Sequence, residues 1–206
     1  MDNKIKIRSI TNEAGVDESY IEFYAAVFNQ RSKLLFENGR YFYEIIERGA
    51  FDELLAKDNL NVKAVVNHDD NKLLGRTKSG TLQLEVDDYG LKAIVKVGKT
   101  TLWNDTLEQI ERGDLFESSF KFKNNKSDES IRRDENGDLV KTIRKISDLY
   151  DVSIVNDAAY SNTNINARLR SFKEFEEAEQ AELKRKEQVE AELVTLRNYI
   201  NKIKNI

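Results

Sequence analysis

The amino-acid composition changes near Arg170, and this change divides the chain into two parts that must fold differently. From Ser171 onward there is no glycine, and Glu, Lys, Ala and Leu dominate, as is typical of a helix. Five apolar residues in this part recur in heptad-like steps of 4, 3, 4 and 3: Val189, Leu193, Leu196, Ile200 and Ile203. A lone helix with so narrow an apolar stripe buries little. Residues 171–206 are therefore predicted to form a charged amphipathic tail that packs on its own domain or pairs with another protein.

Residues 1–170 are predicted to form one β-rich domain. Period-two alternation or short apolar runs predict strands at residues 4–10, 20–28, 41–46, 61–68, 81–86, 91–97, 116–123, 139–146 and 150–155. Helices are expected at 49–55 and 102–110, the second with a threonine cap and with Gly113 just past its end. The polar segments 69–72 and 124–138 are predicted to be loops, the latter with a tight turn at Asn136–Gly137.

The composition excludes several kinds of functional site. There is no cysteine, which excludes disulfides, thiolate metal sites and thiol nucleophiles. There is one histidine, His68, so a metal centre with several histidines is excluded as well. A formal net charge of −4 gives no basic field, so we expect no direct nucleic-acid partner. The charged start Met1–Ile5 and the lack of an apolar run of about 18 residues predict neither a signal peptide nor a membrane span.

Ser119 and Asp151 are candidate functional residues because of the strand faces that they occupy. Alternation in residues 116–122 puts three phenylalanines and Ser118 on one face, and Ser119 on the other. The aromatic face should be the core face, so Ser119 is predicted to point towards solvent or a cleft. The same argument applied to residues 151–155 turns Asp151 outward.

His68 is the third candidate, at the end of a predicted buried strand. With Asp69 and Asp70 it makes only a weak metal-binding pattern, and two acids in a solvated loop explain the segment as well. Each candidate also has an ordinary structural explanation: a structural histidine, a solvent-facing serine and a surface aspartate. Because a catalytic triad is defined by geometry, these separate patterns do not decide between the two.

Seven segments in order between about Tyr41 and Arg168 carry a resemblance to a known family. They are Phe42–Ile46 leading into Gly49–Phe51; Asn67–Asp69; Leu73–Thr77 with Ser79–Leu82; Asp88–Leu91; Arg112–Asp114 followed by Ser119–Phe122; Leu149–Val155; and Ala159–Thr163, closed by Arg168. In this order and with these gaps, the chain resembles the prohead maturation proteases of tailed phages.

The resemblance implies an α+β fold: a small β-barrel of mostly antiparallel strands wrapped by helices, similar to herpesvirus assemblin, with a C-terminal helix. It also implies a serine endopeptidase that cleaves scaffold and capsid precursor proteins, and itself, inside the immature prohead in the host cell cytoplasm. The implied partners are the major capsid protein precursor and the scaffold protein, and a homo-oligomer through the helical tail is a further expectation. No cofactor, metal or membrane is implied.

By motif match, the resemblance implies that Ser119 is the nucleophile, His68 the base and Asp151 the acid that orients His68. Many relatives have glutamate at the third position, and relatives usually have proline where this chain has Ala158. For the oxyanion, we expect donors from backbone N–H groups of residues 156–161, or from a water held there.

Two alternatives remain open from the sequence. One is a non-catalytic capsid assembly or scaffolding protein that acts through its helical tail, and the other is a protease fused to a remnant scaffolding helix. Separation of His68, Ser119 and Asp151 by more than about 8 Å would remove the peptidase mechanism.

Overall fold

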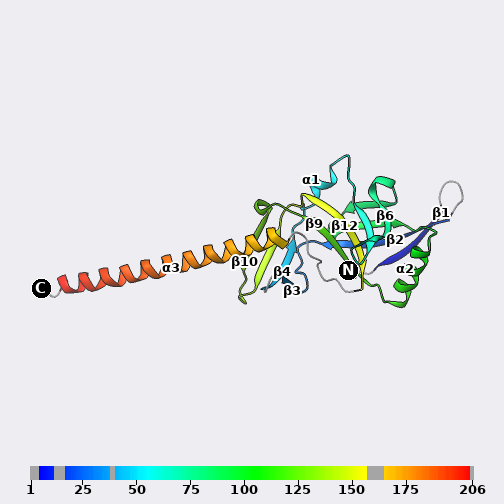
Figure 1. The fold of residues 1–206 in the computed structure, drawn as a ribbon. Coiled ribbons are helices and arrows are strands. Elements are labelled where there is room, and N and C mark those ends of the chain that lie inside the picture. Colours follow the sequence, from blue (N-terminus) through cyan, green and yellow to red (C-terminus); the bar gives the residue numbers. More distant parts are fainter. Residues whose placement is uncertain (1–4, 12–16, 38–39, 157–164, 205–206) are drawn as a thin grey trace. The chain divides into compact units, whose positions relative to one another are not determined.

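The structure, a computed structural model, describes residues 5–11, 17–37, 40–156 and 165–204 (Figure 1). The chain divides into two units, residues 1–164 and residues 165–206. The described part of the second unit is one helix, α3 (Ile165–Lys204). The predicted C-terminal helix is thus confirmed, and it begins at Ile165 rather than at Ser171.

The described strands of the first unit form three sheets of four strands each. The first sheet is antiparallel throughout, in the order β1 (Lys6–Thr11), β2 (Asp17–Val27), β8 (Gly90–Lys96) and β7 (Leu82–Val86). The second has the order β10 (Glu129–Arg133), β11 (Leu139–Ile143), β4 (Arg40–Ile46) and β3 (Leu35–Glu37), and its β11–β4 pair is parallel.

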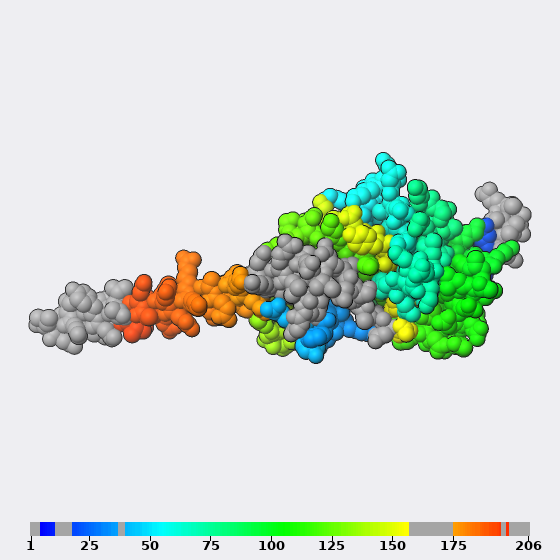
Figure 2. Space-filling model, in the orientation of Figure 1, coloured from blue at the N-terminus to red at the C-terminus, as the bar shows by residue number. Residues whose placement is uncertain are grey.

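The third sheet has the order β6 (Asp69–Arg76), β5 (Lys63–Val66), β12 (Asp148–Val155) and β9 (Glu117–Lys123). Strand β12 runs parallel to β5 and antiparallel to β9. Figure 1 shows β12 in yellow beside β9 in green, and in Figure 2 the cyan to blue-green part of the chain, which includes β5 and β6, lies next to yellow residues from the part that includes β12. Because β12 has a partner on both sides, its position is fixed by two ladders of backbone hydrogen bonds.

In the described residues of this unit, two α-helices and two 3₁₀ turns connect the strands: α1 (Asp52–Leu55), η1 (Thr77–Ser79), α2 (Thr101–Arg112) and η2 (Lys126–Asp128). The side chain of Thr100 caps α2 by accepting a hydrogen bond from the N–H of Trp103. Gly113 ends the helix at φ 80°, a conformation that glycine adopts without strain. Trp103 is buried in the apolar core, so both predicted ends and the packing face of this helix are confirmed.

Phenylalanines from the start of α1 and from β9 meet in this core. The rings of Phe51 and Phe120 have centroids 6.0 Å apart, and those of Phe120 and Phe122 lie 5.1 Å apart. All three side chains are buried, and the core extends to Val152 and Ile154 of β12. One face of the third sheet is therefore held by the apolar core, which leaves its other face to carry polar residues.

The α+β class is confirmed, but the prediction of a single small barrel is not. Within the described ranges each sheet keeps two edge strands, so none of them closes on itself. The resemblance to the herpesvirus protease fold therefore remains an expectation.

Two predicted loops contain strands. Segment 69–72 is the start of β6, and segment 124–138 holds η2 and β10. Both strands lie at the edge of a sheet, and exposed edge strands are commonly polar, which gives them the composition of a loop. The predicted turn at Asn136–Gly137 does lie between β10 and β11, with Gly137 at φ 82°.

Candidate active site

The central strand β12 places two polar side chains on one face of the third sheet. Asp151 and Ser153 are two residues apart, so their side chains leave the strand on the same side. Ser153 pairs with Ser119 of β9 in the antiparallel register, which brings the Ser119 side chain to that same side. The strand faces inferred for Ser119 and Asp151 are therefore those that the structure has.

His68 lies in the tight turn that joins β5 to β6. Val66 pairs with Asp69, so Asn67 and His68 are the two residues of the turn, with φ values of 51° and 55°. Two-residue hairpins favour this left-handed conformation, and asparagine and histidine adopt it more readily than most residues. The turn is joined to β12 by hydrogen bonds from the Asn67 N–H to the Ile154 carbonyl (3.0 Å) and from the His68 N–H to Ser153 Oγ (3.2 Å).

These elements bring the three candidate residues into one line of contacts. His68 Nδ1 lies 2.6 Å from Asp151 Oδ1, and His68 Nε2 lies 2.9 Å from Ser119 Oγ. An ionised carboxylate only accepts hydrogen bonds, so the contact with Asp151 requires that Nδ1 carry a proton and donate a hydrogen bond. In the neutral ring Nε2 then has a free lone pair that accepts the Ser119 hydroxyl proton. Such an arrangement can activate a serine as a nucleophile.

The outward position predicted for Asp151 is wrong, because its side chain is only 2% exposed. Ser119 is also only 4% exposed, but it lines a pocket, so of the two surroundings predicted for it, solvent or a cleft, the structure has the cleft. The reason is that strand alternation identifies the face of a side chain and not what covers that face, which here includes the His68 turn. Phe116 shows the converse error: it was assigned to the core face and is 54% exposed.

Two further polar residues take part in this site. Ser153 is fully buried, and its hydroxyl donates to Asp151 Oδ1 at 2.7 Å. Asn67 Oδ1 accepts a hydrogen bond from the N–H of Asn156, just after β12. Both residues lie in the segments that carry the family resemblance, and Ser153 shares a strand face with Asp151. That shared face and the resemblance of segment Leu149–Val155 were the two signs in the sequence of a role for Ser153.

A pocket of about 210 Å³ opens beside Ser119. Its lining comes from the end of β2, the segment Gln30–Lys33, β4 and β9. Two cations in that segment are paired with acids: Arg31 with Asp134, and Lys33 with Glu117, at 2.5 Å in the second pair. The pocket gives Ser119 a neighbouring space that a substrate side chain can enter.

The acids that follow His68 have structural partners rather than a common metal-binding geometry. Asp69 accepts a hydrogen bond from the N–H of Asn71, and Asp70 forms an ion pair with Lys63 at 2.5 Å. The hydrogen bond and charge of Lys63 hold the pKa of Asp70 below its usual value. Among the residues that the structure describes, no group of three or more His, Cys, Asp or Glu side chains could hold a metal ion.

The expected oxyanion donors fall mostly outside the described residues. Of segment 156–161, the structure describes Asn156 alone, and its N–H already donates to Asn67 Oδ1. The motif Ala159–Thr163 also lies outside the described part of the chain.

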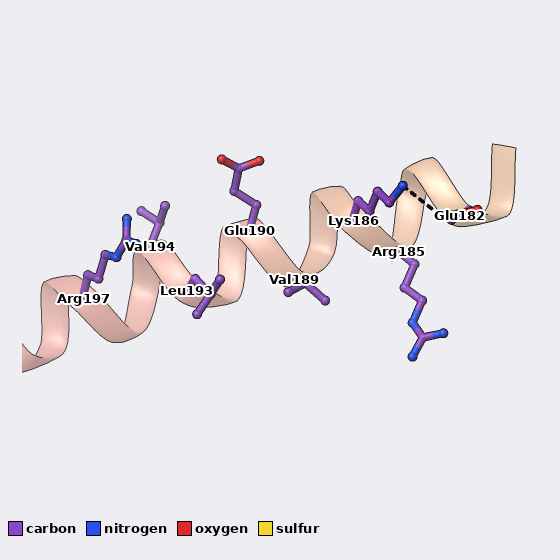
Figure 3. Close-up of a pocket in the computed structure, with 8 residues that line it drawn as sticks. All are labelled: Glu182, Arg185, Lys186, Val189, Glu190, Leu193, Val194 and Arg197. Atoms are coloured by element: carbon purple, nitrogen blue, oxygen red, sulfur yellow. Dashed lines mark ion pairs between the residues drawn. The ribbon is translucent and has the colours of Figure 1, made fainter. Parts of the chain in front are cut away.

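A second hollow is lined by residues of α3. Its eight lining residues are Glu182, Arg197 and six residues between them on the same helix (Figure 3). Val189 and Leu193 lie on one side of the helix, and Glu190 and Val194 on another (Figure 3).

In the described ranges no helix is both long enough and apolar enough to span a membrane.

Comparison with known proteins identifies the family. Searches of curated proteins and of solved structures gave no significant match. The sequence model of one protein family, described as caudovirus prohead serine protease, matches residues 3–178. This match spans all three sheets and includes His68, Ser119 and Asp151. The chain therefore belongs to the caudovirus prohead serine protease family.

Proposed function

We propose that this chain is a serine endopeptidase in which Ser119 is the nucleophile, His68 the general base and Asp151 the residue that orients His68. The observation that carries this proposal is the pair of contacts on either side of the His68 ring, at 2.6 Å and 2.9 Å. Both distances are far shorter than the separation of about 8 Å that would remove the mechanism. The alternative of a non-catalytic assembly protein is not favoured, because it gives no reason for these contacts or for a pocket beside the serine.

The chemistry follows from the protonation states of the three groups. His68 Nε2 takes the hydroxyl proton while Ser119 Oγ bonds to the carbonyl carbon of the scissile peptide. The imidazolium, stabilised by Asp151, then gives this proton to the leaving amine nitrogen as the C–N bond breaks. The oxygen of a water molecule then bonds to the acyl carbon while His68 Nε2 takes the water proton, and His68 gives this proton to Ser119 Oγ as the C–Oγ bond breaks. No cofactor enters this sequence.

The proposed substrates are the scaffold protein and the major capsid protein precursor, together with the protease itself. The proposed place of action is the immature prohead in the host cell cytoplasm. Helix α3 is proposed to recruit the peptidase or to pair with a second copy, because Val189 and Leu193 of its apolar stripe are each about half exposed. The side chains of the other three stripe residues lie outside the described part.

Co-expression with the capsid precursor tests this function. Cleavage of the precursor should occur with the wild-type chain and be lost with Ser119→Ala, as followed by gel mobility and mass spectrometry. The matched control is Ser9→Ala, which removes an exposed hydroxyl from β1 in a different sheet and should leave cleavage intact. Full cleavage by a folded Ser119→Ala protein would refute the proposal.

A further inference from the structure

Ser153 is a fully buried polar residue for which the proposed mechanism so far has no use. It cannot replace Ser119 as the nucleophile, because no part of it is accessible and its hydroxyl proton is donated to Asp151. A buried hydroxyl keeps its place only when its hydrogen bonds are made, so the partners of Ser153 indicate its role.

The partners of Ser153 are Asp151 and His68, the two residues that are proposed to activate Ser119. Ser153 Oγ donates to Asp151 Oδ1 at 2.7 Å and accepts from the backbone N–H of His68 at 3.2 Å. It also lies 3.1 Å from His68 Nδ1. One hydroxyl thus touches the carboxylate, the imidazole ring and the backbone of the turn that carries the ring.

The direction of the Ser153 proton matters for the tautomer of His68. If Ser153 donated to Nδ1, that nitrogen would have to be an acceptor, and Nε2 would carry the proton and could not accept one from Ser119. Asp151 is the stronger acceptor, since hydrogen bonds to an ionised carboxylate are about twice as strong as those between neutral groups. Donation to Asp151 leaves Nδ1 as the donor and Nε2 as the base.

The backbone contact explains how the turn keeps its left-handed conformation. His68 has φ 55°, which is uncommon for residues other than glycine and persists where surrounding contacts enforce it. The Ser153 hydroxyl accepts a hydrogen bond from the His68 N–H and donates one to the Asp151 carboxylate. The backbone of His68 and the carboxylate of Asp151 are thus held by the same group.

We propose that Ser153 is a positioning residue that links the Asp151 carboxylate to the backbone and ring of His68, and so holds the imidazole in line with Ser119. This inference rests on the proposed peptidase function. Ser153 is not among the residues that line the pocket beside Ser119, so its role concerns the rate of the chemical step and not the binding of substrate.

The kinetic test compares Ser153→Ala with the wild-type chain on purified major capsid precursor. We expect kcat to fall about 10- to 100-fold, the loss that follows a displacement of about 1 Å in a catalytic group, with KM unchanged. The matched control is Thr106→Val, which removes another buried hydroxyl, one that donates to the Leu102 carbonyl within α2. It should leave kcat unchanged.

The spectroscopic test uses the fact that His68 is the only histidine in the chain. In a Ser119→Ala background, which prevents cleavage, the His68 Nδ1–H proton should give a single low-field NMR signal. Adding Ser153→Ala should make this proton exchange faster with water, whereas adding Thr106→Val should not. If Ser153→Ala is too unstable to study, Ser153→Cys keeps the shape with a much weaker hydrogen-bonding group and must show both changes.

Unchanged kcat in a folded Ser153 variant overturns the proposal, and so does a loss of kcat with an unchanged Nδ1–H signal. Failure of the proposed function appears differently, as cleavage that survives Ser119→Ala. In that case the NMR comparison still tests whether Ser153 holds the His68 ring.

Discussion

Asp151 reaches the His68 ring directly, with a side chain one methylene shorter than the glutamate expected from many relatives. We predict that Asp151→Asn lowers kcat by about 10⁴-fold, as the same change does in serine proteases with such a triad. The amide can present its NH₂ group to Nδ1, which favours the tautomer in which Nε2 carries the proton. Cleavage rates, with circular dichroism as a check on folding, measure this effect. Activity within tenfold of the wild-type value would show that Asp151 does not orient His68.

At this scale, strand alternation predicted the faces of Ser119 and Asp151 but not what surrounds their side chains. Ser119 and Asp151 were assigned to the correct face because strand alternation is local. Their burial depends on a turn from another part of the chain, which no local pattern contains. Ser153 was missed as a member of the site because its partners, His68 and Asp151, become recognisable only when β12 and the turn are brought together.

At the scale of elements, Gly90 shows why one strand pairing accepts no side chain. A Cβ at this position would lie 2.0 Å from the carbonyl oxygen of Ala26, next to the irregularity in β2. We expect Gly90→Ala to lower the free energy of unfolding by about 3 kcal/mol or more, since backbone must move to accept it. Gly137→Ala is the control, because it meets only open space and costs about 1–2 kcal/mol for its positive φ. Urea unfolding that ranks the two variants equally would contradict this prediction.

The turn between β7 and β8 should make stability depend on pH. Burial alone would raise the pKa of Asp87, but hydrogen bonds from the Tyr24 hydroxyl and from two backbone N–H groups outweigh it and lower the pKa. The same bond to Asp87 raises the pKa of Tyr24 to about 12. A carboxylate with a lowered pKa stabilises the fold above its unfolded pKa of about 3.9, and this contribution disappears as the pH falls through the folded value.

We therefore expect Asp87→Asn to be less stable than the wild type at pH 7, and the difference to shrink below about pH 4. Because Asp87 is exposed, solvent screens the interaction, and the difference should stay under about 1 kcal/mol. Urea unfolding of both proteins between pH 3 and pH 7 measures this, with Asp88→Asn as the neighbouring control. A difference that does not vary with pH would show that the charge of Asp87 has no part in it.

Element boundaries were predictable where the pattern was apolar and failed where it was polar. Helix α2 carries its own cap, apolar face and terminal glycine, so local signals defined both of its ends. Strands β6 and β10 lack such signals because they lie at sheet edges, and only pairing with β5 and β11 makes them strands.

At the scale of the whole molecule, the division into a β-rich unit and a helix follows from the composition change near Arg170. The arrangement of the strands into three sheets could not be predicted in the same way. It depends on parallel pairs such as β12 with β5, whose partners are far apart in the sequence. The family resemblance predicted a single β-barrel, whereas the described strands form three sheets that do not close into one.

The last prediction concerns self-association through α3. The helix has a weak apolar stripe, with Val189 49% and Leu193 48% exposed, and covering these residues with the same stripe of a second copy would bury them. We expect Val189→Asp with Leu193→Asp to abolish self-association in analytical ultracentrifugation, because two charges would have to be buried in the seam. Deleting residues 171–206 should have the same effect, and both proteins should cleave a short peptide substrate at the wild-type rate.

Val194→Asp is the matched control, since Val194 is also 49% exposed but lies on another side of the helix (Figure 3). It should leave self-association intact, because a heptad seam is sensitive to position and not to the net charge of the helix. If Val194→Asp reduced self-association as much as the double variant, the cause would be the added charge and not its position. If the protein without residues 171–206 unfolded, α3 would be part of the folded domain. Either result would contradict a tail that associates independently of the peptidase unit.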